Sequence, residues 1–560
     1  MPAHGEFVLP QQAGSVAEYR RRLLEDRRKL YALTIDEHAG SPGLGFRLPP
    51  FIASLPGDAR FSEEKRRRIN GHKRAARANA WMMLPVALAS RMRSEAAFRR
   101  IVSVLGEPSV ADRWRADAEY ARQRVAGINP MGIRRCDATL DAVFLRTAND
   151  VLTVFGTSVA KAQAAGRLFW THYPELADAR VQAAVAKKGL ALAVPSSLFY
   201  VDDRGGLRAI AIRLLPEKQA PDAVFCPLDP EPEWLLARAH AQAADAHIHQ
   251  AVYHLLETHM VSEATAICAA RELAPMHPVS QLLTPHFEFN LAIDDLARHD
   301  LLSPKGPIDT ALAAGVAGVL DLGRLAYSQW SYPERGLHRD LSTRGVDDPQ
   351  QLPLFPYRDD SLKLWAAIRS YVEAVLAPWY PTDREVHADV ELQAWLALTG
   401  HPQGGAIPGF PSRVEARLPL FDLLSDVIFR ASVQHGAVNN AQFDTYGFVP
   451  NAPGHLRGEV PVCRSRRSMD DYWRAMPSTQ ACFAQISMSW VLSEPTHRSL
   501  LESGECEAFQ KEIEPTAHAA VADFHRSLRQ ISYGIQERNR EWSVPYEYLD
   551  PARVARSTGT

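Results

Sequence analysis

The chain has 560 residues, of which 46% are hydrophobic and 23% are charged, and its formal net charge is −2. Such a composition is that of a globular protein with a sizeable core, and 63 basic against 65 acidic residues argue against a nucleic-acid binder, which needs a positive surface. The six cysteines lie far apart without a C-x-x-C pair, so neither a disulfide scaffold nor a zinc knuckle is indicated. With no visible signal peptide or membrane-spanning apolar run, we expect a cytoplasmic protein.

The first hundred residues are predicted to form a charged helical arm. The segments "EYRRRLLEDRRKLYAL" (18–33) and "FSEEKRRRINGHKRAARANAWMMLPVALASRM" (61–92) are predicted helices separated by a Gly/Pro-rich connector. Their basic runs could touch an anionic membrane surface, although a solvated helix face with Glu–Arg pairs is favoured. We expect a helical N-terminal arm over 1–109 and a catalytic domain over 110–560, which can form one continuous domain.

Residues 190–216, "LALAVPSSLFYVDDRGGLRAIAIRLLP", carry the clearest β signal, because two apolar runs flank the turn "DDRGG" as in a hairpin with a longer loop. From residue 231 onward the pattern is almost wholly helical. The predicted helices span 231–273, 287–302, 308–327, 360–377, 384–399, 417–438, 468–494 and 506–538. The expected fold class is therefore mainly α, with a small β-hairpin or sheet element.

Within the helix predicted over 231–273, the stretch "HIHQAVYHLLETHM" places His249, His254 and His259 at intervals of five. In a regular α-helix residues five apart are rotated by roughly 140°, so His254 and His259 could not share a metal. A π-type turn brings residues i and i+5 close to one face, and such turns concentrate at functional sites. Buried imidazoles need partners, and a metal is an economical one. From spacing alone, surface or hydrogen-bonded core histidines remain the alternative.

A second candidate lies in "FRASVQHGAVNNAQF" (429–443), where His435 and Asn439 are four residues apart on one face of a predicted apolar helix. An imidazole and an amide oxygen can both bind a divalent metal. A nitrogen-rich site with one or two oxygens suits iron or manganese better than structural zinc, which favours thiolates.

The segment 233–286, "EWLLARAHAQAADAHIHQAVYHLLETHMVSEATAICAARELAPMHPVSQLLTPH", closely resembles the histidine signature of lipoxygenases. "DAEYARQRVAGINPMGIRR", "WYPTDREVHADVELQAW", "HGAVNNAQFDTYGFVPNAP" and "YEYLDPARVARSTGT" are similar to other motifs of the family. The family pattern H-x4-H-x4-H-x17-H-x8-H is reproduced by His249, His254, His259, His277 and His286. The first, fourth and fifth of these are not family ligands, and we expect them to be hydrogen-bonded structural residues.

The resemblance covers roughly residues 110–560. It implies a large helical lipoxygenase-type catalytic domain of the bacterial type, and we expect the family's usual lipid-docking β-sandwich to be absent. It also implies one non-haem iron per chain, with manganese less favoured. The implied ligands are the imidazoles of His254, His259 and His435, the amide oxygen of Asn439 and the main-chain carboxylate of Thr560. The family's terminal residue is characteristically isoleucine; threonine carries the same carboxylate, but the tail could be seated less firmly.

The resemblance further implies a substrate pocket. Alanine at position 297 resembles S-type enzymes, since a methyl group there would shield one end of the substrate's pentadiene from oxygen. Two amides, Gln250 and Gln442, match residues that connect the cavity to Asn439. The other positions matching the pocket wall or its bottom are Leu301, Ile308, Leu492, Ala311 and Leu312. Plain core packing is the alternative for Leu301, Ile308 and Leu492, whereas the small bottom pair of Ala311 and Leu312 suggests a deep or wide cavity.

The activity implied is stereospecific dioxygenation of a cis,cis-1,4-diene polyunsaturated fatty acid, with an S hydroperoxide as product. In the family, Fe(III)-hydroxide removes hydrogen from the doubly allylic carbon, and O2 then adds to the opposite face. We expect a fatty acid and O2 as partners, a monomer, and no nucleic acid. Two alternatives stay open: a hydroperoxide isomerase on the same fold, and a lipoxygenase-like protein that binds lipid without turnover.

Overall fold

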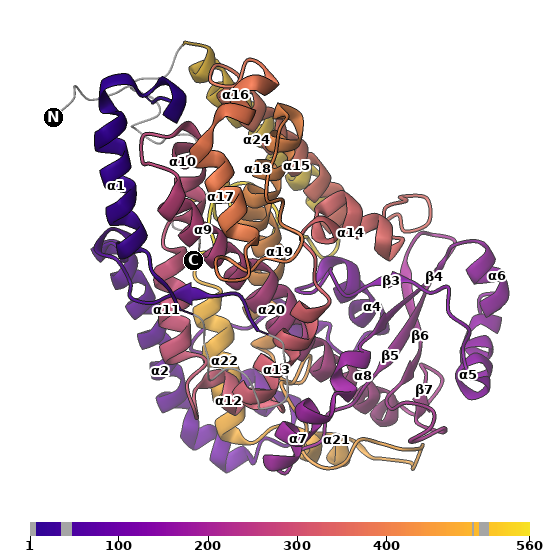
Figure 1. Ribbon diagram of the computed structural model, residues 1–560. Coiled ribbons are helices and arrows are strands. Elements are labelled where there is room, and N and C mark those ends of the chain that lie inside the picture. The colour runs from indigo at the N-terminus through magenta and orange to yellow at the C-terminus, as the bar shows by residue number, and fades with distance from the viewer. Residues whose placement is uncertain (1–6, 35–46, 496–497, 503–514, 560) are drawn as a thin grey trace.

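A helical rod through the interior carries the histidine stretch. In the computed structural model, which describes residues 7–34, 47–495, 498–502 and 515–559, the rod comprises α8 (Glu231–Ile248), the π-helical segment η6 (His249–Met260) and α9 (Val261–Glu272) (Figure 1). Almost every residue of α8 and most of η6 are buried. The predicted helix over 231–273, with a π-type turn at the histidines, is confirmed.

A small antiparallel sheet lies beside the rod, between α4 and α8 on one side and α5 and α6 on the other (Figure 1). The predicted hairpin is its centre: β5 (Ser196–Val201) pairs with β6 (Leu207–Arg213), with a register shift between Leu198 and Phe199. The strand order is β3-β4-β5-β6-β7. The flanking strands are β3 (Arg134–Arg135), β4 (Leu168–His172) and β7 (Val224–Phe225).

The other helices surround the rod and the sheet, and the mainly α fold class is confirmed. Before the rod these are α1 (Ala17–Leu30), α2 (Glu63–Ser90), α3 (Glu95–Arg100), α4 (Asp117–Ala126), α5 (Ala142–Thr153), α6 (Val159–Ala164) and α7 (Ala179–Lys187). After it come α10 (Pro278–Leu283), α11 (Asn290–Asp300), α12 (Pro307–Ala311), α13 (Gly315–Ser328), α14 (Leu337–Arg344), α15 (Pro356–Leu376), α16 (Asp383–Ala388), α17 (Val390–Gly400), α18 (Arg417–Phe429), the π-helical η9 (Arg430–Gln434), α19 (His435–Asn439), α20 (Gln442–Tyr446), α21 (Met469–Ala475), α22 (Thr479–Leu492) and α24 (Pro515–Glu541).

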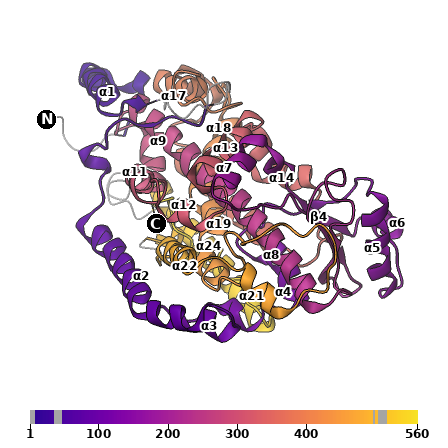
Figure 2. The same ribbon diagram turned by 90° about the horizontal axis from the view of Figure 1, so that it is seen from below.

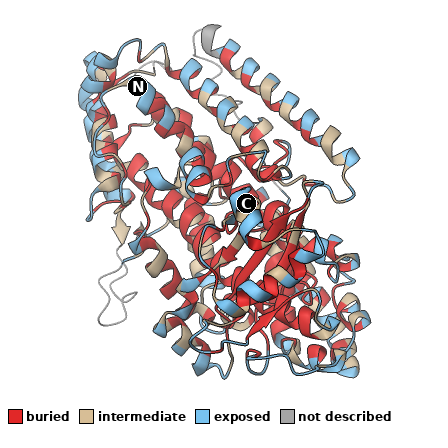
Figure 3. Ribbon diagram, turned by 90° about the vertical axis from the view of Figure 1, so that its right-hand side faces the viewer, coloured by how far each residue is buried: buried red, intermediate tan, exposed pale blue. Residues whose placement is uncertain are grey.

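Three predicted helices are interrupted. The segment 308–327 divides into α12 and α13, 384–399 into α16 and α17, and 468–494 into α21 and α22. The second break has a clear cause, because the side chain of Asp389 accepts the backbone N–H of Leu392 and begins a new helix. Of the helix predicted over 506–538, residues 506–514 lie outside the described part of the chain. Figure 3 shows the buried residues concentrated in the sheet and the central helices.

The N-terminal arm packs on this body. Helix α1 lies along α9, and α2 crosses α22 and follows the outer edge of the molecule (Figure 2). A buried charge cluster fixes α2: Lys65 Nζ lies 3.3 Å and Arg68 Nε 3.0 Å from the carboxylate of Glu494. Within the described residues, no helix has both the length and the apolar character needed to cross a bilayer. The domain boundary at residue 110 stays a prediction.

Replacing Glu494 by glutamine is expected to loosen α2 from α22. Lys65, which is 1% exposed, would lose its carboxylate, and breaking a buried ion pair from one side costs roughly 3–5 kcal/mol. Hydrogen–deuterium exchange should accelerate in peptides of α2 and stay slow in α8. Arg68→Gln removes the partner whose side chain is 32% exposed and should change exchange far less. Unaltered exchange of α2 in Glu494→Gln would show that the pair does not hold the helix.

Candidate metal centre and substrate pocket

Three histidine side chains from two helical segments converge inside the molecule. His254 and His259 both come from η6, and their ring centroids lie 4.9 Å apart. His435, the first residue of α19, places its ring 4.8 Å from that of His259. One ring nitrogen from each lies within 4.8 Å of the other two. The wider π-helical turn makes this possible, because a regular α-helix would direct His254 and His259 to different faces.

The hydrogen bonds of these imidazoles leave nitrogen lone pairs directed at a common point. Nδ1 of His254 donates to Oε1 of Gln250 at 3.1 Å, and Nδ1 of His259 donates to Oδ1 of Asp294 at 2.6 Å. Each Nε2 is then an unprotonated acceptor. Among the described residues, Nε2 of His254 is buried without a hydrogen-bond partner, and Nε2 of His259 lies only 3.2 Å from Nε2 of His435.

Burial keeps two imidazoles of this cluster, those of His254 and His435, neutral. Desolvation, followed by repulsion from the neighbouring histidines, holds the pKa of His254 well below its ordinary value, and desolvation with repulsion from His259 does the same for His435. Neutral imidazoles at pH 7 keep the lone pairs that a metal ion requires. The orphaned Nε2 of His254 and the close approach of two further Nε2 atoms fit a bound metal.

The amide of Asn439 lies one helical turn beyond His435. The residue is 3% exposed and lines the cavity described below. It could add an oxygen ligand to three nitrogens, a donor set that suits iron or manganese. Thr560 lies outside the described residues, so its carboxylate has no assigned position.

The residues just before Thr560 are firmly held. Nδ1 of His286 donates to the carbonyl of Arg556 at 2.8 Å, and Oγ of Ser557 donates to the carbonyl of Glu288 at 2.7 Å. The tail also passes so close to the backbone before α11 that a Cβ at Gly559 would lie 2.3 Å from the Glu288 carbonyl. Hydrogen bonds and close packing therefore seat the tail through residue 559, whatever side chain follows.

A hydrogen-bonded chain joins the tail to the histidine cluster. Nδ2 of Asn290 donates both to Oγ1 of Thr558, at 2.7 Å, and to Oδ2 of Asp294, at 2.8 Å. The other oxygen of Asp294 accepts from His259. A carboxylate in this position fixes the tautomer and orientation of a ligating imidazole. Sequence analysis missed Asn290 and Asp294, although their spacing of four in "NLAIDD" was a usable signal.

The other histidines of the motif have structural partners. His249 is bonded through Nε2 to the carbonyl of Val438 at 2.7 Å and through Nδ1 to the hydroxyl of Tyr446 at 3.0 Å. His277 lies 2.9 Å from Asp389, with both side chains fully buried. His286 holds the tail, as described above. Their spacing therefore reflects packing around the cluster.

An apolar cavity of about 110 Å³ opens beside the cluster. Its wall includes His254, His259 and Asn439. The predicted pocket residues on its surface are Ala297, Leu301, Ile308 and Leu492, together with the amide Gln250. Two residues that sequence analysis did not find, Ile69 and Lys73 of α2, also line it. The cavity can accept an apolar chain and present it to the histidine cluster.

Three predicted residues lie behind this wall. Ala311 and Leu312 are 1% and 2% exposed and pack in the core, away from the cavity surface formed by the described residues. Gln442 accepts a hydrogen bond from Nε2 of Gln250 at 2.6 Å. Since Gln250 also bonds His254, the two amides are connected to the imidazole of His254, and the predicted connection to Asn439 stays a prediction.

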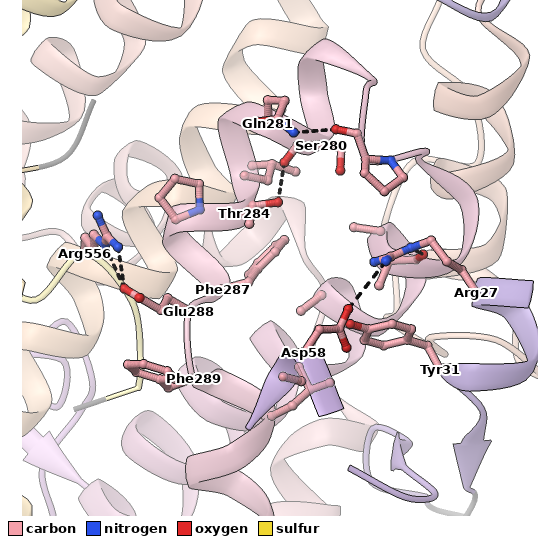
Figure 4. Close-up of a pocket in the computed structure, with 18 of the residues that line it drawn as sticks. Arg27, Tyr31, Asp58, Ser280, Gln281, Thr284, Phe287, Glu288, Phe289 and Arg556 are labelled. Atoms are coloured by element: carbon pink, nitrogen blue, oxygen red, sulfur yellow. Dashed lines mark hydrogen bonds and ion pairs between the residues drawn. The ribbon is translucent and has the colours of Figure 1, made fainter. Parts of the chain in front are cut away.

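A second, larger cavity of about 960 Å³ lies between α1, the segment Thr284–Phe287 and the tail (Figure 4). Its wall mixes apolar side chains with charged pairs: Arg27 lies 3.7 Å from Asp58, and Nε of Arg556 donates to Glu288 at 3.1 Å. None of the three clustered histidines lines it. The apolar cavity is therefore the candidate substrate site.

Comparisons with known proteins agree with this geometry. Residues 101–547 match the family model described as Lipoxygenase. The chain is 31% identical to the polyunsaturated fatty acid lipoxygenase ALOX8 of Mus musculus, over 99% of this chain and 83% of that protein. It is 32% identical to the hydroperoxide isomerase ALOXE3 of Rattus norvegicus, over 80% of this chain, and spans 63% of that protein. The anaerobic crystal structure of delta413-417:GS LOX in complex with arachidonate matches with a TM-score of 0.91 and 30% identity, over 99% of this chain and 84% of that one.

Asp294→Asn is expected to weaken metal retention while preserving the fold. The amide has nearly the same shape but cannot accept the imidazole proton with a full negative charge, and losses of this kind cost roughly 10–100-fold in metal affinity. Metal content after dialysis against graded chelator would measure the effect. Asp295→Asn is the matched control, because this neighbouring carboxylate is 36% exposed and faces away from the cluster. Equal retention in both variants would contradict a role for Asp294.

Proposed function

Because the chain belongs to the lipoxygenase family, we propose that it is a dioxygenase that converts a polyunsaturated fatty acid with a cis,cis-1,4-diene into a lipid hydroperoxide. One observation carries the proposal: the imidazoles of His254, His259 and His435 converge beside an apolar cavity that two of them line. The proposed ligands of one iron are these three residues, Asn439 and the terminal carboxylate of Thr560. We propose iron as the bound metal and regard manganese as the less favoured alternative.

The proposed roles of the chain's residues follow from their positions. A bound redox-active metal would supply the one-electron chemistry that removes a hydrogen atom from the diene. The apolar wall excludes water and holds the diene carbons beside the cluster. Gln250 fixes the orientation of His254, and Asp294 fixes that of His259. The methyl group of Ala297 stands on the same wall and would shield one end of the diene from O2.

The cavity must widen to admit such a chain. Its volume of about 110 Å³ is below the roughly 300–1,000 Å³ typical of sites for drug-sized ligands. The wall combines side chains of α2, α11 and α22, which belong to separate parts of the chain. Binding would therefore be accompanied by rearrangement of side chains or by displacement of α2.

One alternative has specific support. The ALOXE3 relative is named as a hydroperoxide isomerase, and its identity to this chain is as high as that of ALOX8, which is named as a polyunsaturated fatty acid lipoxygenase. The same metal and cavity could take a lipid hydroperoxide as substrate. Lipid binding without turnover has weaker support, because the histidine cluster is intact. A monomeric state and a cytoplasmic location remain predictions.

Purified metal-loaded protein is expected to convert linoleate or arachidonate to a conjugated hydroperoxide, followed as growing absorbance near 234 nm with O2 consumption. His259→Ala should abolish both this activity and metal binding, because it removes one of three converging nitrogens. His299→Ala, an exposed histidine on α11, serves as control. Conversion of an added hydroperoxide, with no turnover of the free acid, would favour the isomerase instead. Full metal occupancy in His259→Ala would contradict the ligand assignment.

Ala297→Gly is expected to shift the product in both position and hand. Wild type should give mainly the S hydroperoxide, and removing the methyl would expose the other end of the diene to O2 on the same face. A barrier difference of about 1.4 kcal/mol already changes a product ratio tenfold, so one methyl suffices. Chiral chromatography of the products measures both position and hand. The control is Ala292→Gly, because Ala292 is a buried residue of α11 that does not line the cavity. An R product from wild type, or an unchanged product from the variant, would refute control by residue 297.

A further inference from the structure

The outward face of α2 exposes large apolar side chains in its C-terminal half. Trp81 is 80% exposed, Leu88 62% and Leu84 43%. At 3.6 residues per turn these three positions fall on one stripe of the helix. Single exposed leucines are ordinary, but a contiguous apolar stripe around a tryptophan marks a surface that binds something.

The same stripe is cationic in the preceding turns. Arg74 and Arg77 are exposed and, with Trp81, Leu84 and Leu88, fall within about 100° of arc on the helix. Within the part of the chain that the structure describes, neither arginine has a carboxylate partner. Residues 71–90 contain no Asp or Glu at all. The stripe is therefore positive along one half and apolar along the other.

Helix α1 is also basic, but its arginines are paired with carboxylates. Arg21 and Arg22 both pair with Glu18 at 2.8 Å, and Arg28 reaches Glu272 at 2.5 Å. The favoured prediction of Glu–Arg pairs thus holds for α1. Arg74 and Arg77 of α2 differ, because they have no carboxylate partner among the described residues and lie beside exposed apolar side chains.

The stripe lies on the same helix that forms part of the candidate substrate cavity wall. Ile69 and Lys73 of α2 line the cavity, and the exposed side chains of Trp81, Leu84 and Leu88 follow further along the same helix, which runs along the edge of the molecule (Figure 2). At a rise of about 1.5 Å per residue, Trp81 lies about 12 Å along α2 from Lys73. A ligand held at the stripe would therefore be close to the part of α2 that lines the cavity.

We propose that the outward face of α2, from Arg74 to Leu88, docks on the surface of an anionic phospholipid bilayer. Tryptophan beside arginine suits the boundary between headgroups and acyl chains, where an amphipathic helix can lie in the plane of the surface. The unpaired guanidinium groups complement anionic headgroups. Entry of an acyl chain beneath α2 rests on the proposed function, whereas docking itself does not.

Flotation of the full-length metal-loaded protein with vesicles tests the proposal. The protein should bind vesicles of phosphatidylcholine mixed with phosphatidylglycerol, bind weakly to phosphatidylcholine alone, and release at high salt. Arg74→Gln with Arg77→Gln, and separately Trp81→Ser with Leu88→Ser, should each lower partitioning about tenfold or more. The matched control is Val154→Ser with Leu228→Ser, at positions 71% and 60% exposed elsewhere on the surface. The Trp81 contribution to the fluorescence, obtained by difference from Trp81→Phe, should move to shorter wavelength on binding.

Unchanged flotation of both α2 variants would overturn the proposal, as would absence of wild-type binding to anionic vesicles. Sedimentation velocity tests whether this face instead binds a second copy of the chain. If the wild type is a dimer, the Trp81→Ser/Leu88→Ser variant is a monomer and neither binds vesicles, the membrane proposal is also overturned. Failure of the docking proposal can be distinguished from failure of the dioxygenase proposal, because flotation measures vesicle binding and does not require turnover. The apolar variant should retain turnover of dissolved linoleate while losing turnover of linoleate presented in vesicles.

Discussion

The architecture depends on one constraint: two imidazoles five residues apart must reach the same point from one helix. A regular α-helix cannot do this, so residues 249–260 adopt the wider π-helical turn. Such a turn is uncommon by itself and requires support from its surroundings. Here the rod is buried on nearly all sides, and α13, α17 and α19 pack along it. The mainly helical body can be understood as the enclosure that this segment requires.

Enclosure also sets the chemistry of the cluster. Burial disfavours charged imidazoles, and three of them close together disfavour it further, so His254 and His435 remain neutral. Neutral rings must still be oriented. Gln250 and Asp294 provide this by accepting the Nδ1 protons, and Asn290 extends the support from Asp294 to Thr558 of the tail. The position of the C-terminus and the orientation of His259 are thus coupled through three hydrogen bonds.

Structural features that depend on residues close together in the chain could be predicted from the sequence. The spacing of five predicted the π-helical turn, and the spacing of four placed His435 and Asn439 on one helical face. Features that join distant segments could not be found this way. The bond from Asn290 to Thr558 spans 268 residues, and the ion pair from Lys65 to Glu494 spans 429. The helix break at Asp389 likewise depends on a side chain that caps α17 and also meets the buried His277, 112 residues away.

The ion pair between Lys65 and Glu494 fixes the rotation of α2, which contributes both to the cavity wall and to the exposed apolar stripe. A buried ammonium loses its hydration, and an apolar residue of similar size would often be at least as stable at this position. What the pair provides is a defined direction, because Lys65 must meet the single carboxylate of Glu494. Neighbouring positions on a helix differ by about 100°, so a rotation of α2 by one residue would break that contact. The same rotation would remove Lys73 from the cavity wall and turn Trp81 from its outward position. The charge cluster thus fixes at once which side of α2 faces the cavity and which side faces away from the molecule.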